Sequence, residues 1–301
     1  MRVAFTGLGT ALVTPFTSSG ALDEGAIRRL ASRQADAGVH FLVPCGTTGE
    51  TPTLSFAERV RVVELVADEA EGRAMVMAGA GGYDTHEVIE SIRAFQDVGA
   101  QGILSVTPYY NKPTQEGLVQ HYAAIAASTK LPIVVYNVPG RTGSNVEPAT
   151  LARLAAIPNI IGVKEASGNM AQMCEVCRIV PPEFIVLSGD DALALPLMAV
   201  GGRGLISVAS NEAPSEMVEL IEAAEHGDFQ SARRWHQQLM PLMQMNFVES
   251  NPIPVKFAMA AMGLCEPVYR LPMTPPTAAS QQKILAALKD FGMPIVAEAR
   301  A

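Results

Sequence analysis

The chain has 301 residues, 49% of them hydrophobic and 17% charged, a composition that favours a compact folded core and argues against disorder. Its formal net charge of -8 argues against a nucleic-acid surface, which is normally basic. Its apolar runs are far shorter than the roughly 18 residues of a membrane span, and four cysteines are too few for a disulfide scaffold, so we expect reduced thiols and no signal peptide.

Apolar, β-branched runs recur along the first 210 residues and alternate with segments whose apolar residues have helical spacing. We predict eight strands, at 8–16, 40–46, 74–81, 102–108, 132–139, 160–167, 184–191 and 204–210. Runs that are apolar almost throughout are typical of parallel strands covered on both faces. Between them, Asp23 and Ser55 are predicted helix N-caps, Ser55 in a capping box with Glu58, and Gly38 and Gly99 are predicted to end helices.

After residue 211 the strand signals end, and four helical patterns follow, at 213–227, 229–247, 253–263 and 275–292. We therefore predict an α/β fold, a (β/α)₈ TIM barrel over 1–225 followed by a small C-terminal helical region over 226–301. The alternative is a doubly wound open sheet, which usually begins with a G-x-G-x-x-G turn. The candidate "GLGTAL" has Leu12 where the third glycine would stand.

In such a barrel the active site lies at the carboxyl ends of the strands and in the loops after them. The polar stretches at these positions are "GTTGE", "TPYYNKP", "YNVPGRTG", "GVKEASG", "SGDD" and "SVASN". The hydroxyls and turn N–H groups of "GTTGE" suit a carboxylate, although a capped glycine-rich turn is the simpler interpretation. Arg141 suits a bidentate carboxylate contact, although a single loop arginine is more often solvated.

Lys164 lies within an apolar strand, where a charged side chain is unusual. Strand alternation places Gly162 and Lys164 on the inner face, with Gly162 leaving room for the lysine, and Ile161 and Val163 on the outer face. Tyr136, on the preceding strand, is also predicted to point inward. Burial disfavours the charged form of an amine, and a neutral lysine amine can attack a ketone and form a Schiff base.

Simpler interpretations of two candidate sites stay open. Lys164 could form a structural ion pair with Glu165 or Asp190, or extend its amine to the barrel rim. Cys174 and Cys177 form a single C-x-x-C inside a predicted helix, and a structural zinc needs four ligands, so packed thiols are favoured there.

In this order and spacing, "GTTGE", "YNVPGRTG", "GVKEASG" and "LSGDD" resemble the class I, Schiff-base-forming, pyruvate-dependent aldolase and lyase family of (β/α)₈ barrels. That family includes dihydrodipicolinate synthase (4-hydroxy-tetrahydrodipicolinate synthase), N-acetylneuraminate lyase and sugar-acid aldolases. The stretches "VTPYYNKPTQEGL", "VPGRTG" and "NPIPVKFAMAAMGL…RLPMTPPT" narrow the resemblance to the dihydrodipicolinate synthase branch, over nearly the whole chain.

The resemblance implies a reaction in lysine and diaminopimelate biosynthesis. Lys164 would form an imine with pyruvate, and the derived enamine would add to the aldehyde of L-aspartate 4-semialdehyde. Tyr136, Thr47 and Tyr110 would form a proton relay, with Tyr110 supplied by the neighbouring subunit of a tight dimer. The alternatives are a related sugar-acid aldolase or N-acetylneuraminate lyase, or a barrel that binds a keto acid without catalysis.

The resemblance also implies substrate contacts and an assembly. Thr48 would bind the pyruvate carboxylate, with Ile206 and Gly189 close by, and Arg141 would hold the carboxylate of the semialdehyde. It implies no metal or cofactor, and a cytoplasmic homotetramer built as a dimer of dimers.

One feature departs from the lysine-inhibited members of that branch. They carry His and Asn where this chain has Phe56 and Tyr83, and another His where it has Arg59, while Glu87 and Tyr109 match. We therefore predict weak or absent feedback inhibition by L-lysine.

Overall fold

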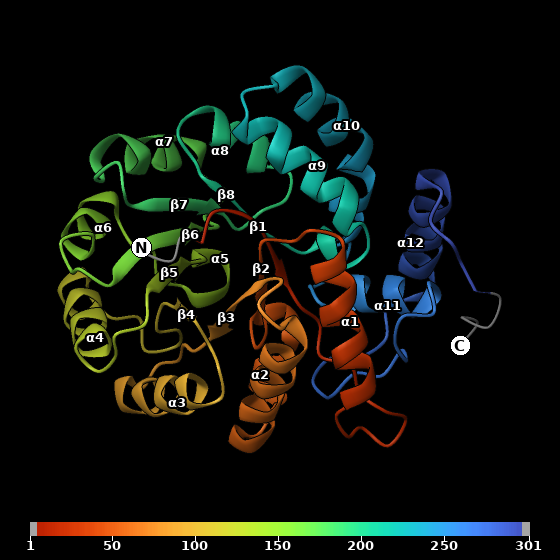
Figure 1. The fold of residues 1–301 in the computed structure, drawn as a ribbon, viewed down its shortest axis with the longest axis horizontal. Coiled ribbons are helices and arrows are strands. Elements are labelled where there is room, and N and C mark those ends of the chain that lie inside the picture. Colours follow the sequence, from red (N-terminus) through yellow and green to blue (C-terminus); the bar gives the residue numbers. More distant parts are fainter. Residues whose placement is uncertain (1–4, 297–301) are drawn as a thin grey trace.

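The computed structural model describes residues 5–296, which form a closed barrel of parallel strands surrounded by helices (Figure 1). The strands are β1 (Gly7–Ala11), β2 (Phe41–Val43), β3 (Met75–Gly79), β4 (Gly102–Val106), β5 (Ile133–Asn137), β6 (Ile160–Glu165), β7 (Ile185–Ser188) and β8 (Gly204–Ser207). Each strand pairs with the next, and β8 pairs with β1. The predicted TIM barrel is confirmed, since an open sheet would leave these two strands unpaired.

The helices that follow the strands form a ring around the barrel (Figure 1). They are α1 (Glu24–Asp36), α2 (Phe56–Ala70), α3 (Thr85–Asp97), α4 (Gln115–Ala127), α6 (Pro148–Leu154), α7 (Met170–Ile179), α8 (Ala194–Ala199) and α9 (Pro214–Glu225). The predicted caps are confirmed: Asp23 accepts from the Ala26 N–H, and Ser55 and Glu58 form the capping box. Gly38 and Gly99 follow α1 and α3 with φ of 85° and 98°, the left-handed conformation that glycine adopts without strain.

Each strand begins within one residue of its predicted start but ends earlier than predicted. The polar residues that follow leave the sheet and form short helices at the barrel mouth. These are η1 (Thr47–Gly49), η2 (Thr51–Thr53), α5 (Pro139–Thr142) and η3 (Ala209–Asn211).

Two apolar layers pack on either side of the barrel wall. The inner one includes Phe41, Tyr136 and Ile206, and the outer one lies under the helices and includes Val135 and Val163. The prediction that Ile161 shares the outer face with Val163 is wrong. Ile133 pairs with Ile160 and Val134 pairs with Gly162, so Ile161 is an extra residue at a register shift and packs against the inner layer.

Three further helices lie on one side of the ring (Figure 1): α10 (Phe229–Met245), α11 (Ile253–Ala261) and α12 (Ala278–Phe291). Val255 and Met259 of α11 pack with Val13 and Val208, which lie within two residues of the carboxyl ends of β1 and β8. This contact brings α11 to the mouth of the barrel. We propose that the two regions meet near residue 225, between α9 and α10. No helix among residues 5–296 is long and apolar enough to cross a membrane.

Candidate active site

Lys164 and Tyr136 occupy partner positions on β6 and β5. The Lys164 amine lies 4.3 Å from the centroid of the Tyr136 ring, and the two residues are only 6% and 7% exposed. Tyr136 belongs to the inner apolar layer. The predicted inward orientation of this pair is therefore confirmed, and the amine lies near the carboxyl end of its strand.

Two glycines shape the space around this lysine, in a way that differs from the prediction. A Cβ added at Gly162 would collide with the main-chain carbonyl of Ile185, so this glycine lets β6 and β7 approach. A Cβ at Gly189 would lie 3.0 Å from Lys164 Cε and 2.6 Å from Ala166 Cβ. Room for the lysine stem therefore comes from Gly189, just beyond β7, rather than from Gly162.

The neighbouring carboxylates are engaged with other groups. Glu165 is fully buried and accepts hydrogen bonds from the Asn137 side chain (2.9 Å) and the Ser167 N–H (2.7 Å). Asp190 accepts from the Ala192 N–H. Within the part of the chain that the structure describes, no ion pair includes Lys164. The ion pair of Lys164 with Glu165 or Asp190, which the sequence analysis kept as an alternative, is thus not formed. The amine is therefore available to bind a ligand.

The stretch "GTTGE" forms the short helix η1 rather than a simple turn. Thr47 is half-buried, and Thr48 is only 2% exposed. The Thr48 Oγ1 atom accepts a hydrogen bond from Nδ2 of Asn251 (3.0 Å). At the end of this stretch, Glu50 forms a buried ion pair with Lys256 of α11. Burial lowers the pKa of Lys256, and the Glu50 carboxylate opposes that shift.

Arg141 lies on the short helix α5 and is exposed at the mouth of the barrel. Its Nη2 atom donates to the main-chain carbonyl of Asn251 (3.2 Å). Asn251 therefore forms hydrogen bonds with both predicted carboxylate ligands, Thr48 and Arg141. Asn251 was not predicted as a site residue, although it is the first residue of the stretch "NPIPVK" that carries the family resemblance.

Ile206 lies on β8, 1% exposed, in the same inner layer as Tyr136. The next residues are held by Asp191, whose carboxylate accepts from the Ser207 hydroxyl and from the Val208 N–H (3.1 Å). Burial raises the pKa of Asp191 to about 6. Asp191 was also not predicted as a site residue. Its position at the end of the family stretch "LSGDD" was the only indication in the sequence.

Tyr110 stands apart from the rest of the predicted relay. Its side chain is 90% exposed, and its backbone is left-handed with φ of 69°. Its neighbour Tyr109, in contrast, packs edge-on against Tyr83 with the ring centroids 5.3 Å apart. Within a single chain, Tyr110 is therefore not brought to Tyr136.

Cys174 and Cys177 lie on α7, and no metal-binding cluster occurs among the described residues.

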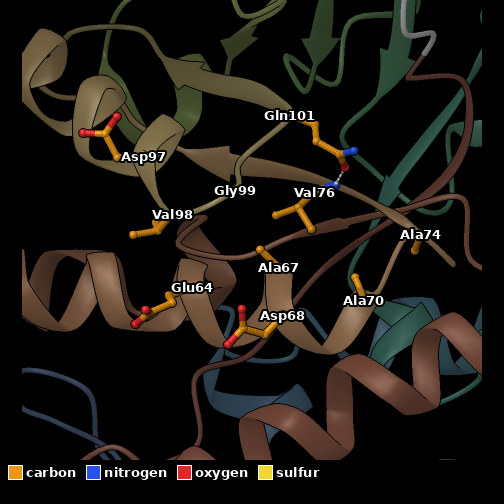
Figure 2. A pocket seen from close by; sticks show the side chains of 11 residues that line it. Glu64, Ala67, Asp68, Ala70, Ala74, Val76, Asp97, Val98, Gly99 and Gln101 are labelled. Carbon is orange, nitrogen blue, oxygen red and sulfur yellow. Dashed lines mark hydrogen bonds between the residues drawn. The ribbon is translucent and has the colours of Figure 1, made fainter.

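A surface pocket lies at the opposite end of the barrel, and its lining residues are shown in Figure 2. It has a volume of about 410 Å³ and is lined by the end of α2, the start of β3 and the turn before β4. Within it, the side chain of Gln101 accepts a hydrogen bond from the Val76 N–H (3.0 Å). Because this is the amino-terminal face of the strands, it is not where a barrel of this kind carries its reactive groups.

A family model described as the dihydrodipicolinate synthetase family matches residues 4–291. The chain belongs to this family. A 4-hydroxy-tetrahydrodipicolinate synthase from Chloroherpeton thalassium is 50% identical over 293 residues, which cover 97% of each chain. The resemblance expected from the sequence motifs is therefore confirmed.

Solved structures of the family superimpose on nearly the whole chain. Dihydrodipicolinate synthase from Aquifex aeolicus gives a TM-score of 0.95 at 43% identity, covering 97% of this chain and 99% of the other. The chloride-inhibited dihydrodipicolinate synthase from Acinetobacter baumannii, described as complexed with pyruvate, gives 0.95 at 42% identity, covering 97% and 100%. Because these matches cover 97% of this chain, they include its C-terminal helices.

Proposed function

We propose that this chain is a 4-hydroxy-tetrahydrodipicolinate synthase, a lyase that condenses pyruvate with L-aspartate 4-semialdehyde in lysine and diaminopimelate biosynthesis. The observation that carries the proposal is the buried Lys164 amine, which faces the Tyr136 ring at the carboxyl end of β6 and has no carboxylate partner among residues 5–296. The family membership and the names of the most similar relatives support this choice of substrates.

The Lys164 amine attacks the ketone carbon of pyruvate, and loss of water gives an imine. Removal of a methyl proton gives an enamine, whose carbon adds to the aldehyde of the second substrate. The amine of that substrate then attacks the imine carbon, which closes the six-membered ring and releases the lysine. Each stage moves a proton, and Tyr136, whose ring centroid lies 4.3 Å from the amine, would accept and return it. Thr47 and a partner's Tyr110 would complete the relay.

Two anionic substrates need separate carboxylate ligands. Thr48 would donate its hydroxyl hydrogen to the pyruvate carboxylate, beside Ile206 and Gly189. Arg141, held at the mouth by the Asn251 carbonyl, would bind the carboxylate of the semialdehyde. Because the imine itself acts as the electron sink, the reaction needs no metal or cofactor.

The assembly is part of the proposal. An aromatic side chain as exposed as Tyr110 supports a subunit interface at the barrel mouth. We therefore propose self-association in which a partner subunit supplies Tyr110, within a cytoplasmic homotetramer built as a dimer of dimers.

Borohydride reduction in the presence of pyruvate tests the proposal, since it converts the imine to a stable amine. We expect mass spectrometry to find one pyruvate adduct per chain, on Lys164. Absence of the adduct would overturn both the synthase and the aldolase alternatives. With the adduct present, turnover of aspartate semialdehyde supports the synthase, and turnover of sugar acids alone would assign the chain to the aldolases.

A further inference from the structure

Asn251 makes contacts with both predicted carboxylate ligands, through different parts of the residue. Its side-chain Nδ2 donates to Thr48 Oγ1 (3.0 Å), and its main-chain carbonyl accepts from Arg141 Nη2 (3.2 Å). Asn251 is 4% exposed and lies between α10 and α11, outside the barrel strands. One residue of the C-terminal region thus contacts two side chains of the barrel mouth.

The contact with Thr48 determines which way that hydroxyl can act. An amide NH₂ group only donates, so the Thr48 oxygen accepts in this hydrogen bond. The single hydroxyl hydrogen then remains available to another acceptor. No other hydrogen bond of the Thr48 hydroxyl occurs in the described part of the chain. Asn251 therefore presents Thr48 as a donor, which is what a carboxylate ligand requires.

A packing role does not account for an amide at this position. The Oδ1 atom of Asn251 is buried and has no hydrogen-bond partner among residues 5–296. Burying an unpaired amide oxygen costs folding free energy, which an apolar side chain would avoid. The amide is therefore better explained by what its NH₂ group does to Thr48.

The segment that carries Asn251 is fixed to the barrel at a second point. Five residues further on, Lys256 forms its buried ion pair with Glu50, which ends the same "GTTGE" stretch that contains Thr48. The Lys256 amine also lies 4.0 Å from the centroid of the Phe16 ring. These contacts hold the start of α11 in register with η1, so Asn251 is in a rigid position relative to Thr48.

We propose that Asn251 is a positioning residue, whose side chain presents the Thr48 hydroxyl to the pyruvate carboxylate while its main-chain carbonyl holds Arg141 for the second substrate. The inference rests on the proposed function. It has an asymmetric consequence, because a side-chain substitution removes the Thr48 contact and keeps the carbonyl that Arg141 uses. The pyruvate site is then weakened selectively.

The test measures the pyruvate concentration that half-saturates borohydride trapping on Lys164, which needs no second substrate. Asn251→Asp keeps the shape but replaces the donor with an acceptor, which captures the Thr48 hydrogen and places a negative charge beside the carboxylate site. We expect the pyruvate concentration at half-saturation to rise about tenfold or more. Asn251→Ala removes the donor without adding charge, and a smaller rise is expected. Ser250→Ala, at the exposed neighbouring position, is the matched control and should behave as wild type.

Steady-state kinetics and a double-mutant cycle separate positioning from general loss of structure. KM for pyruvate should rise in both Asn251 variants, while KM for aspartate semialdehyde changes by less than about twofold. In a Thr48→Val background, Asn251→Ala should cause no further rise, because no hydroxyl is left to orient.

Three results would overturn the inference. Unchanged pyruvate saturation in a folded Asn251→Asp variant would remove the positioning role. An equal rise in both KM values with a lowered melting temperature would indicate a structural role only, as would additive effects in the cycle. A wild-type chain that forms no pyruvate adduct would overturn the proposed function and this inference together.

Discussion

The Lys164 amine lies 4.3 Å from the centroid of the Tyr136 ring on the neighbouring strand. Among the described residues, no carboxylate forms an ion pair with this amine. The electron-rich face of a phenol ring stabilises a nearby cation without neutralising it, as a carboxylate would. The ring therefore holds the Lys164 amine in place without a salt bridge that would occupy it.

Replacing Lys164 should abolish covalent chemistry while leaving the fold intact. Lys164→Ala is expected to form no pyruvate adduct and to lower kcat by more than about 10³-fold, since the imine is the route to the carbon nucleophile. Lys164→Arg, which keeps a cation but not a nucleophile, should be equally inactive. Substantial turnover by either variant would exclude Lys164 as the reacting amine.

Tyr136→Phe tests proton transfer separately from imine formation. The ring, and hence the packing against Lys164, is retained, whereas the hydroxyl is lost. We expect kcat to fall by about 10²- to 10³-fold, with pyruvate still trapped on Lys164 at a lower rate. A wild-type kcat in this variant would assign the proton transfers to another group.

The sequence predicted the barrel well because apolar β-branched runs and helix caps are local signals. The strands were predicted to end too late, since apolar residues such as Cys45 and Val138 do not reveal that the chain has already left the sheet. Strict alternation failed at Ile161, because a register shift depends on the partner strand.

The site was only partly predictable for the same physical reason. Lys164 stood out because a charged residue is rare in an apolar strand, and strand order then supplied Tyr136 as its neighbour. Asn251, in contrast, contacts Thr48 across a separation of 203 residues, and nothing local in either stretch indicates that pairing. A hydrogen bond of this kind becomes visible only when the C-terminal helices are placed against the barrel mouth.

Tyr110 offers a test of subunit sharing. If a partner supplies this residue, Lys164→Ala and Tyr110→Phe chains should each be impaired but should complement each other when mixed. A mixed dimer contains one site with an intact Lys164 and an intact Tyr110, so random mixing should restore about a quarter of wild-type activity. Mixtures that stay at the level of the separate variants, with subunit exchange verified by mass spectrometry, would place the relay within one chain or exclude Tyr110.

The response to L-lysine should be weak or absent. Arg59 lies 5.6 Å from the Phe56 ring, and its guanidinium would repel the cationic side chain of a bound lysine. Activity titrated with lysine at limiting pyruvate should change little, whereas a variant with Phe56→His, Arg59→His and Tyr83→Asn should gain inhibition. Strong cooperative inhibition of the wild-type chain would contradict the prediction.

His121 should make the fold sensitive to mild acid. Its ring is 7% exposed on α4, Nδ1 lies 2.8 Å from the Thr85 hydroxyl, and Nε2 is buried with no hydrogen-bond partner among the described residues. Burial lowers the pKa of His121 from 6.5 to about 4. The unfolded chain therefore binds a proton at a higher pH than the folded chain does, and stability that is complete above pH 6.5 is lost as the pH falls towards 4.

A shift of this size corresponds to about 3 kcal/mol in the free energy of unfolding, which denaturant titrations at pH 7.5, 5.5 and 4 can resolve. His121→Asn, which takes up no proton, should unfold more easily at pH 7.5 because it loses the edge-on contact with Tyr122, yet lose less stability on acidification than the wild type. His86→Asn, on the exposed surface of α3, is the control and should keep the wild-type slope. If His121→Asn lost as much stability as the wild type between pH 6.5 and 4, another buried group would have to account for the acid sensitivity.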